Sequence, residues 1–245
     1  MSKVGIIEYD KLAIGMCLMR DNIYLREWRC PLPNLTNGWS MFVNCTHLES
    51  FSSDLSKLEL GCYMFAGCEA LTSWDIDLPS LTKGDWMFND TKLTSWNIDL
   101  SSLTSGCDMF MGCKNLTTFT SDLSSLTDGR GMFSDCSLDA PSVKSVALTI
   151  NENVTNTPRI DLGMPDEVAN DEQVKKDIGL IRHKGWNVYT NGSDATTTYT
   201  LPKYAGCTTY EAIASKYPDY LETDIVNGAW TEHLPDLKKG FYTDG

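Results

Sequence analysis

A phrase of about 23 residues recurs along this chain, and it limits the possible folds more than any other feature. Each copy ends in a Met-Phe pair, and successive pairs are 23, 23, 22 and 23 residues apart. The unit can be written C-x-x-L-x-x-[WF]-x-x-D-L-x-x-L-x-x-G-x-x-M-F. A segment this short cannot bury its own apolar face, so neighbouring units must stack and share one core. The pairs are Met41-Phe42, Met64-Phe65, Met87-Phe88, Met109-Phe110 and Met132-Phe133.

Each constant position of the unit has a physical reason. In one copy, Leu71 and Trp74 form a short apolar pattern that predicts a strand facing the core. Leu78 and Leu81 fill the turn that follows, and Gly84 stands where the backbone must reverse. The tryptophan position therefore predicts that Trp74 and its equivalent Trp96 are buried.

We call equivalent positions of successive units a column. The order of these columns, the 23-residue period and phrases such as "MFAGCEALTSW" resemble BspA-type leucine-rich repeats over residues 22–140. That family forms curved solenoids on bacterial surface proteins and also occurs in phage-encoded proteins. The chain differs from the commoner pattern in having Asp-Leu where the family often has Ile-Pro. The expected fold class is an α+β repeat, a leucine-rich-repeat solenoid with a small α+β C-terminal module.

Four regions are expected: an N-terminal segment (1–21), the solenoid (22–141), an α+β module (142–229) and a degenerate repeat-like turn (230–245). The module is predicted to begin with one or two strands over 142–154. A helix then runs from an N-cap at Asn170 or Asp171 to Gly185, and a hairpin turns at Asn191-Gly192. A second short helix ends at Pro218. The last region places Trp230, Leu234, Pro235, Leu237 and Gly240 in repeat register, and whether it is a true coil stays open.

The net charge and the cysteine content limit the classes of partner and the cellular compartment expected for this chain. With 20 Lys and Arg against 33 Asp and Glu, the formal charge of −13 argues against nucleic acid and against insertion into anionic membranes. The first residues do not resemble a secretory signal, and no run approaches membrane-spanning length. The odd number of nine cysteines, without a paired framework, favours free thiols made in a reducing cytoplasm.

Signatures of catalysis are not found in the sequence. The three histidines, His47, His183 and His233, lie outside any nucleophile or zinc-protease motif, and no phosphate-binding glycine loop occurs. The chain is therefore expected not to be an enzyme and to need no cofactor. A glycan hydrolase that uses two of the many carboxylates is a distant third possibility.

The cysteine column and the aspartate column could each bind metal, but a structural role is favoured for both. The cysteine column could hold a metal or disulfides, yet Thr91 interrupts it and free cysteine packs as a small hydrophobe. The aspartate column could hold calcium, yet Asp side chains commonly accept backbone N–H groups in their own turns. The columns are Cys45, Cys68, Cys113 and Cys136, and Asp54, Asp77, Asp99 and Asp122.

Positions that vary between units mark the surface and carry the ligand-binding candidates. One set lies beside the predicted strands as a polar strip, and the alternative for it is a merely solvated sheet. The other set is aromatic and lies near the closing turn, where partial burial against the next coil is the alternative. The candidates are Ser73, Asp75, Ser95, Asn97, Thr118 and Thr120 in the strip, and Trp39, Tyr63 and Trp86 in the aromatic set.

Together these features predict a non-enzymatic binding or structural protein. The first interpretation is a phage virion component, such as a fibre, tail or head-decoration protein, made in the host cytoplasm. The alternative is a bacterial cell-surface leucine-rich-repeat adhesin. The expected partners are other virion or surface proteins and a host-surface protein or glycan. Residues 1–22 and 230–245 are expected to contact another subunit, because repeat arrays need covered ends.

Overall fold

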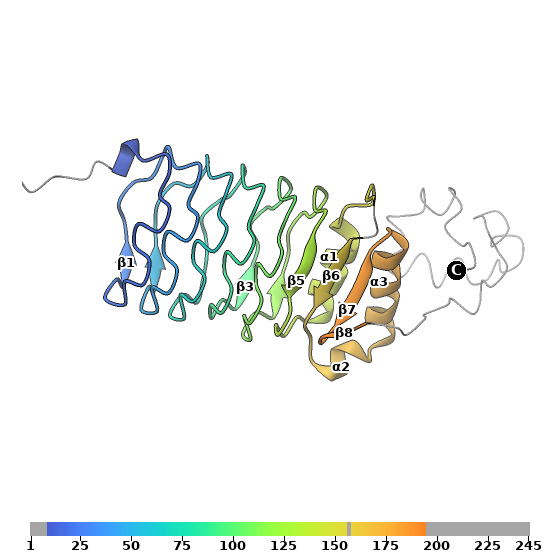
Figure 1. Ribbon diagram of the computed structural model, residues 1–245. Helices are drawn as coiled ribbons and strands as arrows, with labels where there is room; N and C mark the ends of the chain where they lie inside the picture. The colour runs from blue at the N-terminus through green and yellow to red at the C-terminus, as the bar shows by residue number, and fades with distance from the viewer. Residues whose placement is uncertain (1–8, 156–157, 195–245) are drawn as a thin grey trace, which may run out of the picture.

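The chain forms a repeat fold in which successive units lie side by side (Figure 1). The computed structural model describes residues 9–155 and 158–194. One parallel bridge per unit joins the residue before each glycine to its equivalent in the next unit. We call each unit a coil. The bridged residues are Ile14, Asn37, Leu60, Lys83, Ser105 and Asp128.

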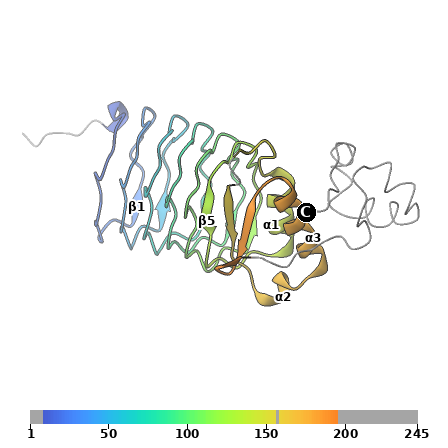
Figure 2. The ribbon, with the colours of Figure 1, turned by 45° about the vertical axis from the view of Figure 1, so that its right-hand side comes forward.

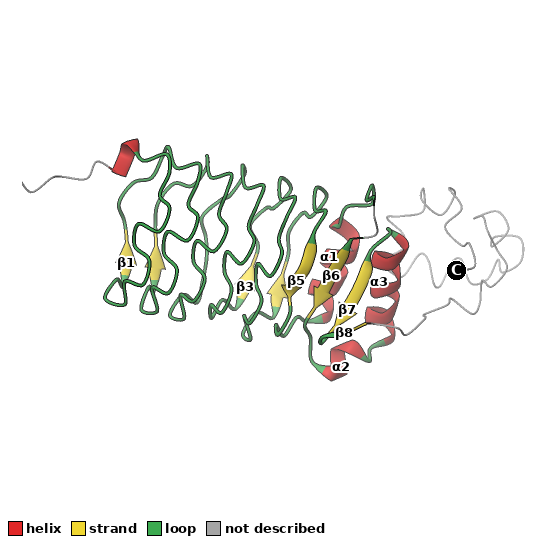
Figure 3. Cartoon of the chain, viewed as in Figure 1, coloured by secondary structure: helices red, strands yellow, loops and turns green. Residues whose placement is uncertain are grey.

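Regular strands within the coils are short, and most of each coil is turn and loop (Figure 3). Strand β1 (Glu27–Trp28) pairs in parallel with β2 (Ser50–Phe51), and β3 (Ser95–Trp96) pairs with β4 (Thr118–Phe119). Each of these strands has one exposed and one buried residue. The alternation matches the predicted strand position, with the aromatic side chain turned into the core.

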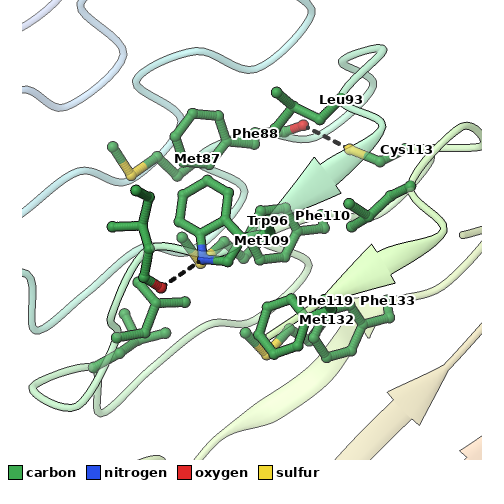
Figure 4. Packing of buried hydrophobic residues seen from close by; sticks show 14 of the residues in the cluster. Met87, Phe88, Leu93, Trp96, Met109, Phe110, Cys113, Phe119, Met132 and Phe133 are labelled. Atoms are coloured by element: carbon green, nitrogen blue, oxygen red, sulfur yellow. Dashed lines mark hydrogen bonds between the residues drawn. The ribbon is translucent and has the colours of Figure 1, made fainter. Parts of the chain in front are cut away.

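Aromatic rings form the centre of the stack. The phenylalanines of the five Met-Phe pairs lie parallel, with neighbouring ring centroids 5.4, 5.5, 5.8 and 5.7 Å apart. The aromatic rings of the strand positions meet them edge to face (Figure 4), an arrangement that the ring quadrupoles favour. Trp74 and Trp96 are 7% and 1% exposed, so their predicted burial is confirmed.

The stacked pattern begins upstream of residue 22. Gly15, Leu18 and Met19 take the places that Gly38, Met41 and Phe42 hold in the next coil. The N–H of Gly15 donates to the carbonyl of Asn37 at 2.8 Å. The 3-10 helix η1 (Tyr9–Lys11) precedes this coil. The sequence pattern missed the coil because Leu-Met stands there in place of Met-Phe.

At the other end, the last coil continues into a four-stranded sheet. Strand β5 (Gly129–Phe133) contains the last Met-Phe pair and pairs in parallel with β6 (Arg159–Leu162). Strand β7 (Asn187–Thr190) pairs with β6, and β8 (Ser193–Asp194) forms the edge. Helices α1 (Ala140–Thr149), α2 (Asp166–Ala169) and α3 (Glu172–His183) lie at this end of the chain (Figure 2). Helix α1 packs against α3 and β4, so the module covers this end of the stack.

The predicted strands over 142–154 are wrong, because most of that segment is helix α1. The side chain of Asp139 caps the helix by accepting the N–H of Ser142, and Pro141 stands in its first turn. Val143 and Val146 are buried on one helical face. Their β-branched side chains suggested strand, but packing against the stack outweighs that weak preference.

Two other predictions for the module are confirmed. Helix α3 begins after Asp171, whose side chain accepts the N–H groups of Gln173 and Val174, and Gly185 follows its end with φ +93°. The hairpin turns at Asn191-Gly192, with Thr190 paired to Ser193. The second helix and the repeat-like turn 230–245 lie outside the described residues.

Candidate binding surfaces

One side of the stack carries the parallel bridges and the Met-Phe pairs, and we call it the ladder side. Each coil has two backbone positions with positive φ on this side. Glycine is suited to these positions and occupies some of them. Bulky aromatic residues there are unusual and strained. The first column is Cys17, Ser40, Tyr63, Trp86, Asp108 and Gly131, and the second is Asp21, Asn44, Gly67, Asp90, Gly112 and Asp135.

The three predicted aromatic candidates come together on this side. Trp39 stacks on Tyr63 with ring centroids 6.5 Å apart, and Tyr63 stacks on Trp86 at 5.7 Å with an interplanar angle of 7°. Trp39 is 44% exposed, and the other two are half-buried. We call these three residues the aromatic stack. It crosses three coils, and Tyr63 and Trp86 reach it from left-handed backbone, with φ 58° and 59°.

Acidic side chains lie beside the aromatic stack, and the sequence patterns did not single them out. Asp85 accepts hydrogen bonds from Ser105 Oγ at 2.6 Å and from the N–H of Cys107 at 3.0 Å. The Cys107 thiol donates to Asp108 Oδ2 at 3.1 Å. Burial is the largest cause of the raised pKa of Asp108. A side chain at Gly131 would collide with this carboxylate, so the glycine in "GRGMF" was the available signal.

Arginine residues follow where the stack meets the sheet. Arg130 pairs with Asp128 at 2.7 Å. Arg159 pairs with the buried carboxylate of Asp161 and lies 3.7 Å from the ring centroid of Tyr189. The ladder side thus runs from aromatic through acidic to cationic groups, which gives a ligand several kinds of contact.

The predicted polar strip is a second exposed surface. Its six residues are exposed, and the register of β3 and β4 places Ser95 beside Thr118 in the neighbouring coil. Within the described residues, none of the six side chains makes a hydrogen bond. Their hydroxyl, amide and carboxylate groups are available to water or to a ligand, and their binding role stays a prediction. The six are Ser73, Asp75, Ser95, Asn97, Thr118 and Thr120.

The cysteine column lies inside the stack and has a structural role. Cys68 Sγ donates to the carbonyl of Phe42 at 3.2 Å, and Cys113 Sγ donates to that of Phe88 at 3.1 Å. Thr91 donates instead to the Phe88 carbonyl of its own coil, which also accepts from Cys113, so the hydroxyl is satisfied without the bond that a thiol makes to the preceding coil. Burial raises the pKa of the Cys113 thiol to about 11, so it stays protonated. All eight described cysteines are free.

Native alkylation should therefore be selective. Cys17 is exposed and should react first with iodoacetamide. Cys68 and Cys136 should react only on unfolding, because burial raises both pKa values and the reactive species is the thiolate. Peptide mapping of timed reactions would measure this order, and without reductant all nine cysteines should label after denaturation. Rapid native labelling of Cys68, or disulfides surviving denaturation, would contradict the assignment.

The aspartate column shows the turn geometry of Asx-turns. Asp54, Asp99 and Asp122 each accept the N–H of the residue two positions later. Asp77 is followed at that distance by Pro79, which has no N–H to donate. No group of three or more metal-ligating side chains occurs in residues 9–155 and 158–194.

Two of the three histidines lie within the described residues. His47 is exposed, and its Nδ1 lies 3.2 Å from the hydroxyl of Thr46. His183 closes helix α3, and His233 lies outside the described residues. In the part of the chain that is described, no helix is long and apolar enough to cross a membrane.

Comparison with known proteins identifies the repeats. Residues 37–157 match the family model of the BspA type leucine rich repeat region, in six copies. No curated protein and no solved structure matches the chain. The matched range covers the coils from the second onward, with the same glycine, Met-Phe and cysteine columns that build the core. The chain is therefore a BspA-like leucine-rich-repeat protein.

Proposed function

We propose that this protein is a non-enzymatic binding protein whose repeats form a rigid solenoid scaffold for recognition. The observation that carries the proposal is the aromatic stack. Tyr63 and Trp86 hold a backbone conformation that costs about 1–3 kcal/mol for residues other than glycine. Other coils place Ser40 or Gly131 at the same position, so the core does not require a ring there. Strain kept at an exposed aromatic cluster suits a contact surface.

We further propose that the protein is a phage virion component that attaches to a host-surface protein or glycan. Support comes from the phage-encoded members of the family and from the free thiols, which suit assembly in a reducing cytoplasm. A bacterial cell-surface adhesin is the alternative, and it rests on the same family resemblance. Mass spectrometry of purified virions and of bacterial envelope fractions would separate the two. Detection only in the envelope would overturn the virion assignment.

Replacing Tyr63 or Trp86 with Gly should separate binding from stability. Each change removes about 0.5–1.5 kcal/mol of ring stacking and relieves about 1–3 kcal/mol of backbone strain. The free energy of unfolding should therefore fall by no more than about 0.5 kcal/mol or rise by up to about 2.5 kcal/mol. Binding of the labelled protein to host cells should fall at least about tenfold, as expected when a hot-spot aromatic is removed. Urea unfolding and flow cytometry measure the two effects.

Ser40→Gly is the matched control, because it makes the same backbone change in the same column without removing a ring. It should leave cell binding unchanged. If Tyr63→Gly and Trp86→Gly bind as well as the unaltered protein, the aromatic stack is not the contact surface. The polar strip would then be the next candidate.

A further inference from the structure

Apolar side chains are exposed at the first coil. Among the described residues, the large hydrophobic side chains exposed to solvent lie in residues 14–24, apart from Trp39. In later coils, the position of Leu18 is held by fully buried methionines such as Met41 and Met64. Within residues 9–155 and 158–194, no segment covers the outer face of the first coil. The exposed residues are Ile14 (60%), Met16 (53%), Leu18 (36%), Ile23 (47%) and Tyr24 (88%).

The backbone of this edge has a row of open carbonyls on the ladder side. Along the ladder, each coil donates N–H groups to carbonyls of the following coil, as Gly15 does to Asn37 and Gly38 does to Leu60. The equivalent carbonyls of the first coil receive no hydrogen bond from any described residue. On the ladder side this edge is therefore a row of open acceptors, and beside it the N–H groups of Ala13 and Ile14 also lack a described partner, where Thr36 and Asn37 of the next coil donate to the coil before them. These carbonyls belong to Ile14, Met16, Leu18 and Arg20.

The opposite end of the stack is already covered by the module. The Phe119 N–H donates to Ser142 Oγ of helix α1, and the Gly131 N–H donates to Asp161 of β6. The open edge and this covered end lie far apart along the stack (Figure 1). Symmetric pairing of two copies through this carbonyl row would set acceptors against acceptors. The missing neighbour must bring a row of N–H donors.

The chain contains one further segment with the pattern of such a neighbour, residues 230–245. Trp230, Leu234, Leu237 and Gly240 have the spacing of Trp28, Leu32, Leu35 and Gly38. All four residues of the second set are buried in the structure. A coil placed before the first one would turn its N–H groups toward the open carbonyls. In ladder register, the Gly240 and Tyr242 N–H groups would meet the carbonyls of Ile14 and Met16.

We propose that residues 230–245 of a second copy cover the first coil, so that the protein assembles head to tail. The same chain's own residues 230–245 are the alternative occupant, because the 35 residues between Asp194 and Trp230 are long enough to reach the first coil, and a monomeric full chain would be the result that this alternative gives. Such a heterologous contact, repeated, makes open filaments or closed rings. Phe241 would also fall in the column of Met16 and Trp39, where aromatic and sulfur groups contact favourably. The inference rests on the assembly part of the proposed function but not on ligand binding by the aromatic stack.

Complementation between two defective variants tests this interface. Truncation before Trp230 keeps the open edge and removes the docking segment, whereas Met16→Lys keeps the segment and places a charge on the edge. In sedimentation velocity from about 1 µM to about 1 mM, the full chain should associate progressively. The dissociation constant for self-association of each variant alone should be at least about tenfold higher than that of the full chain. Mixed, the two should form a one-to-one dimer that grows no further.

Further variants keep the result independent of folding and of ligand binding. Ile14→Glu is a second edge variant, Thr118→Lys is a control on the polar strip, and circular dichroism checks that each variant folds. Trp86→Gly should associate normally even where it fails to bind cells, so failure of either proposal can be recognised. A full chain that stays monomeric throughout the range overturns the head-to-tail contact. So does association that persists in both defective variants, or a mixture that does not form the dimer.

Discussion

Replacing Trp96 with Ala is expected to lower the free energy of unfolding by about 3–5 kcal/mol. Trp96 is 1% exposed, and its ring meets those of Phe88 and Phe110 edge to face at 5.1 and 4.8 Å (Figure 4). Its indole N–H also donates to the carbonyl of Ile98 at 2.9 Å. The substitution therefore leaves a cavity between two coils and an unpaired carbonyl in the turn.

Urea unfolding of Trp96→Ala beside Ser95→Ala would measure this cost. Ser95 is the exposed neighbour on the same strand, and its change should stay within about 0.5 kcal/mol. A loss below about 1 kcal/mol at Trp96 would mean that the aromatic column does not carry the core.

Replacing Asp177 with Asn is expected to stabilise the protein at neutral pH. Asp177 lies on helix α3, is 1% exposed and accepts a hydrogen bond from Gln173 Nε2 at 3.1 Å. Burial is the largest cause that raises its pKa from 3.8 to about 6. Because the folded state holds the proton more tightly, Asp177 favours folding below about pH 4, and that advantage disappears as the pH rises through about 6. Above this window the buried carboxylate costs about 2–3 kcal/mol.

Asn cannot ionise, so the Asp177→Asn variant should unfold at higher urea concentration near pH 8 and at nearly the same concentration near pH 4. Glu167→Gln, an exposed carboxylate on helix α2, serves as the control and should show little difference at either pH. If Asp177→Asn has the same stability difference from the unaltered protein at both pH values, the carboxylate is not desolvated in the folded state.

Local patterns predicted the repeats and parts of the module well. The spacing of Trp74 and Trp96 identified a buried column, because every coil repeats the same environment and so repeats the same residue type. Helix α3 was recognisable because Asp171 and Gly185 mark its two ends with local hydrogen bonding and a positive φ. These features depend on residues a few positions apart, which a sequence displays directly.

The first coil and helix α1 were missed for the opposite reason. Leu18-Met19 departs from the repeated pair, and only the ladder bonds to the next coil reveal its place. Val143 and Val146 favour strand by intrinsic preference, but burial against the last coils and the Asp139 cap make a helix.

The repeat, the columns that form its core and the positions that vary on its surface can all be recognised in the amino-acid order. How the variable positions meet follows from the folded chain, in which the coils lie against one another. The fold placed Trp39, Tyr63 and Trp86 in one stack, brought Asp85 and Asp108 beside them, and left four carbonyls of the first coil without a donor among the described residues. The physical reason is that a core column is set by the environment that each coil repeats. A surface cluster or an open edge depends instead on side chains and backbone groups from different coils, which only stacking brings together.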